Sequence, residues 1–436
     1  MNNDFRIEVE LQQLTPMLHF QGIQHGACLR ASEVKPKLDR FVFNCLKKRG
    51  IELAALPAGW TDLHAEEADS EPASAALRYK MRFRANGENH CSPDIHPLYF
   101  GNRGTNPNKA FNLFIPNGMH ITLLVLTDEV LPRKIRLWDS GPEVNTLSGI
   151  LRALIPAFFE LHCFGARSNK GFGSFRVKGS NLSPEELQQL MASNCEAMFW
   201  LENFSPEYDS VRRLDDVYVL SGMMKGGFSR LRNGAKYPGA IQELFHNQRV
   251  PVGTEKDFIK AKVFTEYEKD WYWREVCRKQ GAWKGPQEYG EYRFARVLLG
   301  LTEQYAFGIG SNSKRYKVTP EDKEIQRFAN PVVFKPRENG LLILVHAIPD
   351  AILNTSYQFA RERTQNHKRL DPPREFDMVH FVAEFLSPLK RQAKIVPHEW
   401  IAMEGGSFQK GGRKIEYSNT LKSLRLQAIF EEVNRS

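Results

Sequence analysis

The chain has few cysteines and no long apolar run. Its 436 residues include six cysteines, and no two of them form a CxxC pair, which indicates reduced thiols rather than a disulfide framework. No apolar stretch approaches the roughly 20 residues that a membrane helix needs. The first residues, Met1 to Arg6, lack the apolar core of a signal peptide. We therefore expect a soluble, cytoplasmic protein with no membrane partner.

Signatures of nucleotide and metal sites are also missing. The glycine-rich segment 165–176 is not a Walker loop, because Lys170-Gly171 lacks the upstream glycine and the following Ser or Thr. A strand pattern follows it, which excludes a dinucleotide fingerprint. Two histidines and a cysteine fall within residues 90–96, but no second ligand pair has a recognisable zinc spacing. We expect neither a metal nor a cofactor.

The sequence is rich in apolar and basic residues. Apolar residues make up 42% of the chain and include 29 Phe, enough for sizeable cores and too many for global disorder. Sixty Lys and Arg exceed 51 Asp and Glu, giving a net charge of +9. Such an excess attracts a polyanion, but many ordinary basic proteins share it. The length favours more than one domain.

The first half has the order of elements of an α+β domain. Alternating apolar residues predict strands at 5–14, 77–85 and 118–127, and helical spacing predicts helices at 31–48 and about 147–158. Polar segments on either side of the second strand read as an insertion at about 50–110. This order predicts a ferredoxin-like (RRM-type) fold with insertions over residues 1–195.

The second half predicts a separate α/β region that is rich in helices, over residues 196–436. A charged stretch at about 208–310 has helical character, and strands are expected near 332–334 and 341–345. A helix follows at about 376–385. No internal repeat of fixed period is visible.

The strongest local signal is the glycine-rich segment. Gly165, Gly171 and Gly173 permit tight turns and a close approach of the backbone to a ligand, and exposed N–H groups in such turns bind anions. Arg167 and Lys170 add positive charge, and Phe172 or Phe175 could stack on a base. A glycine-rich hairpin with two core phenylalanines explains the same residues, so both interpretations stay open.

Two further basic segments are candidates for phosphate contacts. The start of the helix at 31–48 offers early N–H groups together with four cations: Arg30, Lys35, Lys37 and Arg40. A solvated charged helix face is the alternative. A second basic, glycine-containing cluster at 225–234 includes Lys225 and Arg230, and here the alternative is a helix C-terminus with its usual cations.

Three segments in this order resemble the hallmarks of the RAMP superfamily, in particular the subunits of type III (Cmr-type, III-B-like) CRISPR effector complexes. In that family an opening strand ends in a turn such as Leu14-Thr15-Pro16, and a helix like that at 29–41 follows. Later comes a glycine-rich loop of GxRxxKGFGxF type, here residues 165–175. The segment 328–336, with Phe334-Lys335-Pro336, is similar to a strand found late in large Cmr-type subunits.

The resemblance implies a ferredoxin-like fold that grips guide RNA, or the guide–target duplex, through its backbone, while base pairing reads the sequence. It implies guide RNA, target RNA and other RAMP subunits as partners, in antiviral defence. The contacts would come from the cations at 30, 35, 37, 40, 167 and 170, with the glycines at 165, 171 and 173 allowing close approach.

Some RAMP relatives cleave RNA, so an endonuclease is the second hypothesis. Guide-processing enzymes use a histidine, and target-cleaving subunits use an aspartate with a metal. The candidates here are His19, His25 and Asp94. A processing enzyme tends to be smaller and to carry its glycine loop near the C-terminus, whereas about 260 residues follow the loop in this chain. We therefore expect a binding subunit without catalytic activity.

Overall fold

A computed structural model describes most of the chain. The described residues are 5–18, 29–62, 75–87, 90–91, 112–114, 118–191, 195–202, 210–226, 228–230, 236–237, 239–272, 274, 288–307, 314–338, 340–361, 367–391, 407–410, 413–416 and 425–428. It is a mixed α/β structure with several antiparallel sheets. Among the described helices, none is both long and apolar enough to cross a membrane.

Contacts divide the chain into two compact units that interleave along the sequence. Unit 1 comprises residues 1–217, 333–344 and 423–436, and unit 2 comprises residues 218–332 and 345–422. The boundary that we expected at 195/196 stays a prediction, since contacts define compact units rather than separately folding domains.

Unit 1 is built on a four-stranded sheet with the order β3-β6-β1-β9, in which all neighbours are antiparallel. The strands are β1 (Arg6–Gln13), β3 (Tyr79–Ala85), β6 (Met119–Val125) and β9 (Phe175–Val177). The alternation in sequence predicted the first three correctly, because outward and inward side chains alternate along a strand. Strand β3 lies within the segment 50–110, yet it is an integral strand of this sheet.

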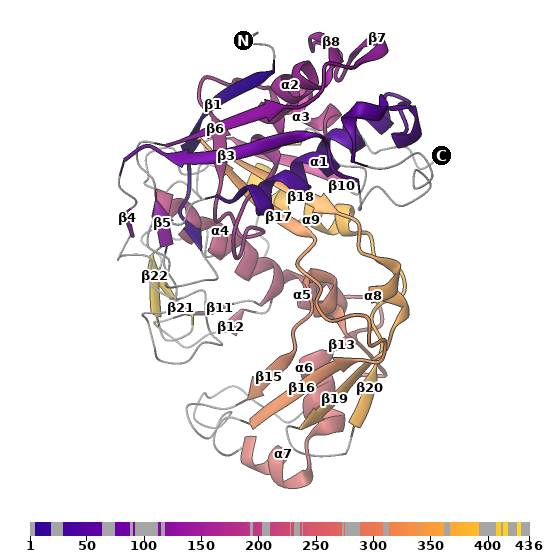
Figure 1. Ribbon diagram of the computed structural model, residues 1–436. Helices are drawn as coiled ribbons and strands as arrows, with labels where there is room; N and C mark the ends of the chain where they lie inside the picture. The colour runs from indigo at the N-terminus through magenta and orange to yellow at the C-terminus, as the bar shows by residue number, and fades with distance from the viewer. Residues whose placement is uncertain are drawn as a thin grey trace. The chain divides into compact units, whose positions relative to one another are not determined.

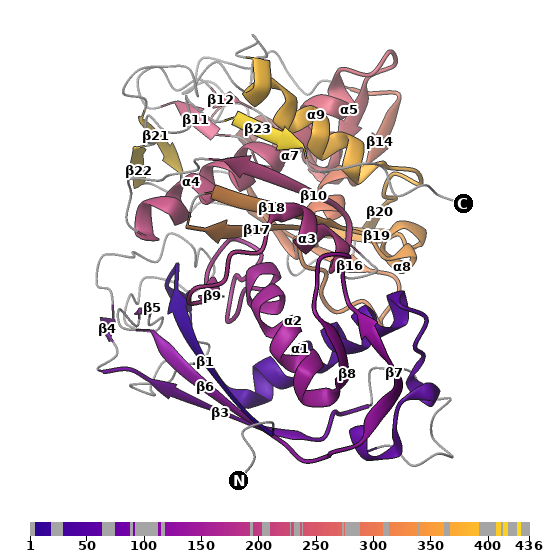
Figure 2. The same ribbon diagram turned by 90° about the horizontal axis from the view of Figure 1, so that it is seen from above.

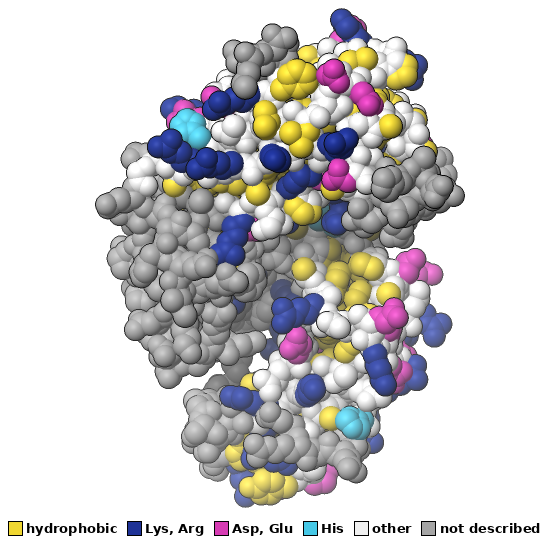
Figure 3. Space-filling view, in the orientation of Figure 1, with side chains coloured by type: hydrophobic (Ala, Val, Ile, Leu, Met, Phe, Trp, Pro, Cys, Tyr) yellow, Lys and Arg dark blue, Asp and Glu magenta, His cyan; other side chains and the backbone are white. Residues whose placement is uncertain are grey.

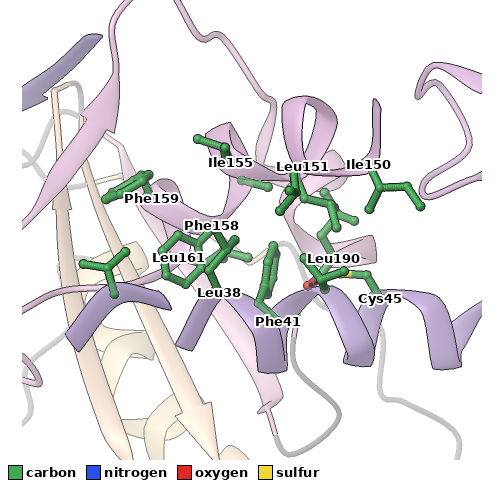
Figure 4. Packing of buried hydrophobic residues seen from close by; sticks show 14 of the residues in the cluster. Leu38, Phe41, Cys45, Ile150, Leu151, Ile155, Phe158, Phe159, Leu161 and Leu190 are labelled. Carbon is green, nitrogen blue, oxygen red and sulfur yellow. Dashed lines mark hydrogen bonds between the residues drawn. The ribbon is translucent and has the colours of Figure 1, made fainter. Parts of the chain in front are cut away.

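Two helices cover one face of this sheet: α1 (Ala31–Lys48) and α2 (Leu147–Leu161). Figure 2 shows them side by side on the same side of the strands. Figure 4 shows their apolar stripes in contact, with Phe41 of α1 against Phe158 of α2 at 5.7 Å between ring centroids. The stripe on α1 follows the i, i+3, i+4 and i+7 spacing of Leu38, Phe41, Val42 and Cys45, all buried.

A second sheet of unit 1 has the order β17-β18-β10-β23. It joins β10 (Cys195–Glu202), β17 (Val332–Arg337), β18 (Gly340–His346) and β23 (Arg425–Ala428). The strands expected near 332 and 341 are therefore present. Most of this pair is grouped with the N-terminal part of the chain, a long-range pairing that local sequence patterns do not reveal.

The remaining elements of unit 1 are short. They are β2 (Met17–Leu18), β4 (His90–Cys91), β5 (Asn112–Phe114), β7 (Val130–Arg136), β8 (Glu143–Thr146) and α3 (Pro184–Gln189). Helix α4 (Ser210–Lys225) runs across the division between the units.

Unit 2 contains a four-stranded antiparallel sheet of order β15-β16-β19-β20 and a small sheet of order β12-β11-β21-β22 (Figure 1). The first comprises β15 (Gln304–Phe307), β16 (Lys314–Pro320), β19 (Tyr357–Arg361) and β20 (His367–Leu370). The second comprises β11 (Phe228–Arg230), β12 (Lys236–Tyr237), β21 (Ser407–Lys410) and β22 (Arg413–Glu416). A parallel pair joins β13 (Val252–Thr254) to β14 (Glu291–Arg293).

The helices of unit 2 are mostly short. They are α5 (Ala240–His246), α6 (Glu255–Phe258), α7 (Glu266–Tyr272), α8 (Asp350–Asn354) and α9 (Met378–Arg391). The expected helical character of 208–310 is present in its described part, and the helix expected at 376–385 corresponds to α9.

Candidate nucleic-acid interface

The two basic motifs of the sequence lie against each other in unit 1. The backbone N–H of Gly165 donates a hydrogen bond of 2.8 Å to the carboxylate of Glu33, in the first turn of α1. The ammonium of Lys37 lies 5.1 Å from the centroid of the Phe164 ring. Helix α1 and the glycine-rich loop therefore form one surface, although they are 132 residues apart in sequence.

The glycines of this loop are required by its own packing. Gly165, Gly171 and Gly173 all have positive φ, at +80°, +84° and +66°. A Cβ on Gly173 would lie 2.0 Å from the carbonyl oxygen of Phe164, and one on Gly165 would lie 2.6 Å from that of Leu18. The space that these two glycines leave is thus occupied by protein backbone. This packing explains both glycines without a ligand, and close approach of RNA stays a prediction.

The turn at Leu14-Thr15-Pro16 anchors the loop from one side. The Thr15 hydroxyl donates to the carbonyl of Gly171 and accepts a 3.0 Å hydrogen bond from the N–H of Ser174. The N–H of Gly173 donates to the carbonyl of Pro16 at 2.8 Å. Thr15 is fully buried, so these bonds are shielded from water and their loss would leave buried polar groups unsatisfied.

Strand β17 anchors the loop from the other side. The ammonium of Lys335 is buried and donates to the carbonyls of His162 and Phe175, both at 2.9 Å. Burial lowers the pKa of Lys335, and the two carbonyls compensate part of the cost of holding its charge. The Ser174 hydroxyl donates to the carbonyl of Pro336 at 2.6 Å. Lys335 and Glu33 are positioning residues that the sequence alone did not single out as such.

Arg167 and Lys170 lie at the tip of this anchored loop. Arg167 has φ +58°, and it is the one non-glycine residue with positive φ among those described. Lys170 is half-buried, and burial together with the charge of Arg167 lowers its pKa to about 8. Repulsion between two cations close together raises the free energy of the protein, and a bound anion would lower it again.

The opening turn with helix α1, the glycine-rich loop and strand β17 therefore form one structural unit. Comparison with known families supports the resemblance that these three motifs carry. The family model of the Cmr1 N-terminal domain matches residues 4–228, and that of the Cmr1 C-terminal domain matches residues 238–404. The chain belongs to the Cmr1 family. The resemblance to RAMP subunits of type III-B CRISPR complexes is confirmed, and the chain is a subunit of such a complex together with other Cmr subunits. No curated protein and no solved structure gives a significant match.

The phenylalanines of the Cmr1-family loop are core residues. Phe172 and Phe175 are both fully buried, and Phe175 packs on Phe164 at 6.2 Å between centroids. Stacking of Phe172 or Phe175 on a base, which we considered from the sequence, would require the loop to unpack. The structure thus favours the core alternative for both rings.

Helix α1 of this Cmr1-family chain uses part of its charge internally. The ammonium of Lys35 contacts the carboxylate of buried Asp39 at 2.7 Å and the carbonyl of Leu77 at 2.8 Å, and it lies 4.4 Å from the centroid of the Tyr79 ring. Burial nevertheless raises the pKa of Asp39, so the carboxylate depends on this partner. Lys35 as a phosphate contact stays a prediction, and its internal partners make it the less available of the cations of α1.

The other cations at the start of α1 differ in their exposure to solvent and in their ionic partners. Lys37 is half-exposed and lies 3.5 Å from Glu33. Arg40 is exposed and has no ion pair within the described part of the chain. Arg30 occupies the N-cap position of the helix in an extended conformation.

For Lys225 in the second basic cluster, the structure favours the alternative interpretation, a cation at the C-terminus of a helix. The ammonium of Lys225 donates to the carbonyls of Leu299 and Gly300, both at 2.7 Å. It satisfies the end of a short helical segment in unit 2, and its contact with RNA stays a prediction. Arg230 ends β11, and its side chain lies outside the described residues.

The candidates for catalysis, His19, His25 and Asp94, lie outside the described residues. Within the part of the chain that the structure describes, no group of three or more His, Cys, Asp or Glu side chains is arranged to hold a metal ion.

Proposed function

We propose that this Cmr1-family subunit is an RNA-binding structural component of its complex. It holds guide RNA, or the guide–target duplex, by contacts to the sugar-phosphate backbone, in antiviral defence in the cytoplasm. The observation that carries the proposal is the anchored loop, which holds Arg167 and Lys170 on the same surface as the start of α1.

The electrostatics of the loop support a phosphate ligand. Anchors on both sides fix the backbone, so binding an anion there costs little conformational entropy. An anion beside Lys170 and Arg167 would offset both their mutual repulsion and the burial that lowers the pKa of Lys170. Such contacts carry no sequence information, which fits a system in which base pairing reads the sequence.

We also propose that the first sheet of unit 1 is ferredoxin-like. The order β3-β6-β1-β9, with α1 following β1 and α2 following β6, supports this assignment. Both helices on one face are typical of a split βαβ unit.

The first test is binding of guide RNA by the full chain, measured by fluorescence anisotropy over a range of salt concentrations. We expect Arg167→Ala and Lys170→Ala each to weaken binding and to reduce the salt slope by roughly 0.7 to 0.9 per lost phosphate contact. Lys134→Ala is the matched control, because Lys134 is exposed on β7 and its substitution removes the same charge. Equal slopes for all three variants would contradict the proposal.

A second test uses the intact complex. The tagged chain, isolated from its host, should bring other Cmr subunits and short RNAs that share a repeat-derived 5′ end. Cleavage of RNA by the isolated chain, lost in His19→Ala, His25→Ala or Asp94→Ala, would instead favour an endonuclease.

A further inference from the structure

The open face of the β3-β6-β1-β9 sheet carries a row of cations. Lys80, Arg82 and Arg84 occupy the successive outward positions of β3, and all three are exposed. None of their side chains has a hydrogen bond or an ion pair with any described residue. Figure 3 shows Lys and Arg side chains gathered over β3 and the strands beside it. We call Lys80, Arg82 and Arg84 the β3 row.

On the outward positions of the described strands of this sheet, the Lys and Arg residues without an ion pair all lie on β3, at this edge. In the strand register, Arg82 lies opposite Thr122, which lies opposite Glu8, and Arg84 lies opposite His120, which lies opposite Glu10. The two carboxylates on β1 are already paired. Glu8 accepts from Arg6 at 2.9 Å, and Glu10 accepts from Lys178 at 2.9 Å. A polyanion would therefore follow β3 rather than cross the sheet.

The spacing of the row suits an extended nucleic-acid strand. Alternate residues of a strand are about 6.6 Å apart, of the same order as the spacing of successive phosphates in an extended single strand. The outward positions of the four strands hold no Phe, Tyr or Trp. Recognition of bases by stacking on aromatic side chains, the usual means of sheet-based single-strand binding, has no residue here to carry it.

We propose that the β3 row binds a single-stranded RNA segment through its phosphates, without reading its sequence. The inference rests on the proposed function and adds a second RNA-binding surface to it, distinct from the glycine-rich loop. Because the contact is purely electrostatic, affinity should depend steeply on salt and little on base composition.

Protection of an edge strand is the competing explanation. β3 is at the edge of its sheet, and charged residues on edge strands hinder pairing with another chain. However, the side chains of a strand project from the faces of the sheet rather than along its hydrogen-bonding direction. Three successive outward cations exceed what protection requires.

The experiment compares two triple variants of the full chain. One is Lys80→Gln, Arg82→Gln and Arg84→Gln, and the control is Arg133→Gln, Lys134→Gln and Lys323→Gln, three exposed cations elsewhere that remove the same charge. Binding of labelled oligouridine and oligoadenosine RNA is measured by anisotropy over a range of salt concentrations, and the monomer content is measured by light scattering. We expect the β3 variant to lose about tenfold in affinity at low salt and roughly 2 units of salt slope, equally for both RNAs, with the control little changed.

The possible failures are distinguishable. If the Arg167 and Lys170 variants weaken binding but the β3 variant matches its control, the β3 inference is wrong and the proposed function stands. If none of these variants differs from its control, the proposed function fails as well. If the β3 variant aggregates while its remaining monomer binds RNA normally, the row protects the edge and the inference is overturned.

Discussion

Two of the four-stranded sheets, β3-β6-β1-β9 in unit 1 and β15-β16-β19-β20 in unit 2, carry similar surface patterns with different partners. In unit 1, every outward position of β3 from 80 to 84 is a cation whose side chain has no partner among the described residues. In unit 2, β16 also alternates, with exposed Arg315 and Lys317 followed by Thr319, but the charge does not continue undisturbed across that sheet. Arg369 on β20 lies 3.4 Å from Asp371 and 3.7 Å from Glu321. Arg315 and Lys317 have no ion pair among the described residues, so the two sheets differ in the length of the unpaired basic row, three cations on β3 against two on β16.

The buried faces of the two sheets differ as well. The unit 1 sheet packs mostly aliphatic side chains against two helices, whereas the unit 2 sheet is lined by rings. Phe264 stacks on Tyr316 at 5.2 Å, and Phe294 meets Tyr357 edge-on at 5.0 Å. Burial raises the pKa of both tyrosines, and a nearby carboxylate adds to the effect, Glu268 for Tyr316 and Asp322 for Tyr357. The difference indicates that unit 2 depends more on placing polar groups correctly inside its core.

The largest expected effect comes from a substitution that disrupts the glycine-rich loop of unit 1 and leaves unit 2 intact. Gly173→Ala puts a Cβ against the carbonyl of Phe164 at positive φ, and we expect it to lower the free energy of unfolding by about 3 kcal/mol or more. Gly179→Ala is the control, because Gly179 has φ +80° but open space around it. It should cost only about 1 kcal/mol. Urea denaturation, with hydrogen exchange to localise the change, measures both, and similar costs would refute the packing role of Gly173.

A pair of charge-neutralising variants sharpens the comparison of the cores. In unit 1, buried Glu160 lies 2.8 Å from Arg337, whose side chain is 14% exposed. In unit 2, equally buried Glu268 lies 3.1 Å from Arg361, which is 40% exposed. We expect Glu160→Gln to cost about 2–3 kcal/mol and Glu268→Gln about 1–2 kcal/mol, because Arg361 can turn to water once its partner is neutral. Thermal or urea unfolding gives the order, and a reversed order would contradict this account.

The next effect is a pH dependence specific to the glycine-rich loop. With a pKa of about 8, Lys170 is charged below that pH and loses its proton in the free protein above it. A bound phosphate would raise this pKa, so RNA affinity should fall by up to about tenfold as the pH rises from 7 to 9. Anisotropy with 2′-O-methyl RNA, which resists alkaline hydrolysis, measures it.

Lys170→Arg is the matched variant for that experiment, because arginine stays charged throughout this range. It should flatten the profile while keeping affinity at pH 7. A profile that stays steep in Lys170→Arg would assign the titration to another group.

The smallest expected effect tests the opening comparison directly. The double variant Arg315→Gln and Lys317→Gln, on β16 of unit 2, should change RNA affinity by less than about threefold. A loss of affinity as large as that of the β3 variant would mean that a shorter basic row beside other ion pairs also binds RNA, and that both sheets contribute.

Local patterns in the sequence determined the secondary structure of the best-defined regions and the family. Alternation predicted β1, β3 and β6, helical spacing predicted α1, α2 and α9, and the order of three motifs identified the RAMP resemblance. These signals are short-range, because side-chain direction repeats every two or 3.6 residues. The β3 row belongs to the same class of signal, since residues 80, 82 and 84 alternate visibly.

Only the tertiary structure decided which candidate residues have partners inside the protein. The sequence offered Lys35, Lys225 and Phe172, as it did Arg40 and Lys170, without showing their contacts. The fold pairs Lys35 with Asp39, binds Lys225 to carbonyls 74 and 75 residues away, and buries Phe172. It also brings Thr15, Glu33 and Lys335 to a loop that lies 132 to 160 residues from them. A side chain's partner is set by contacts at such distances along the chain, and no local pattern encodes them.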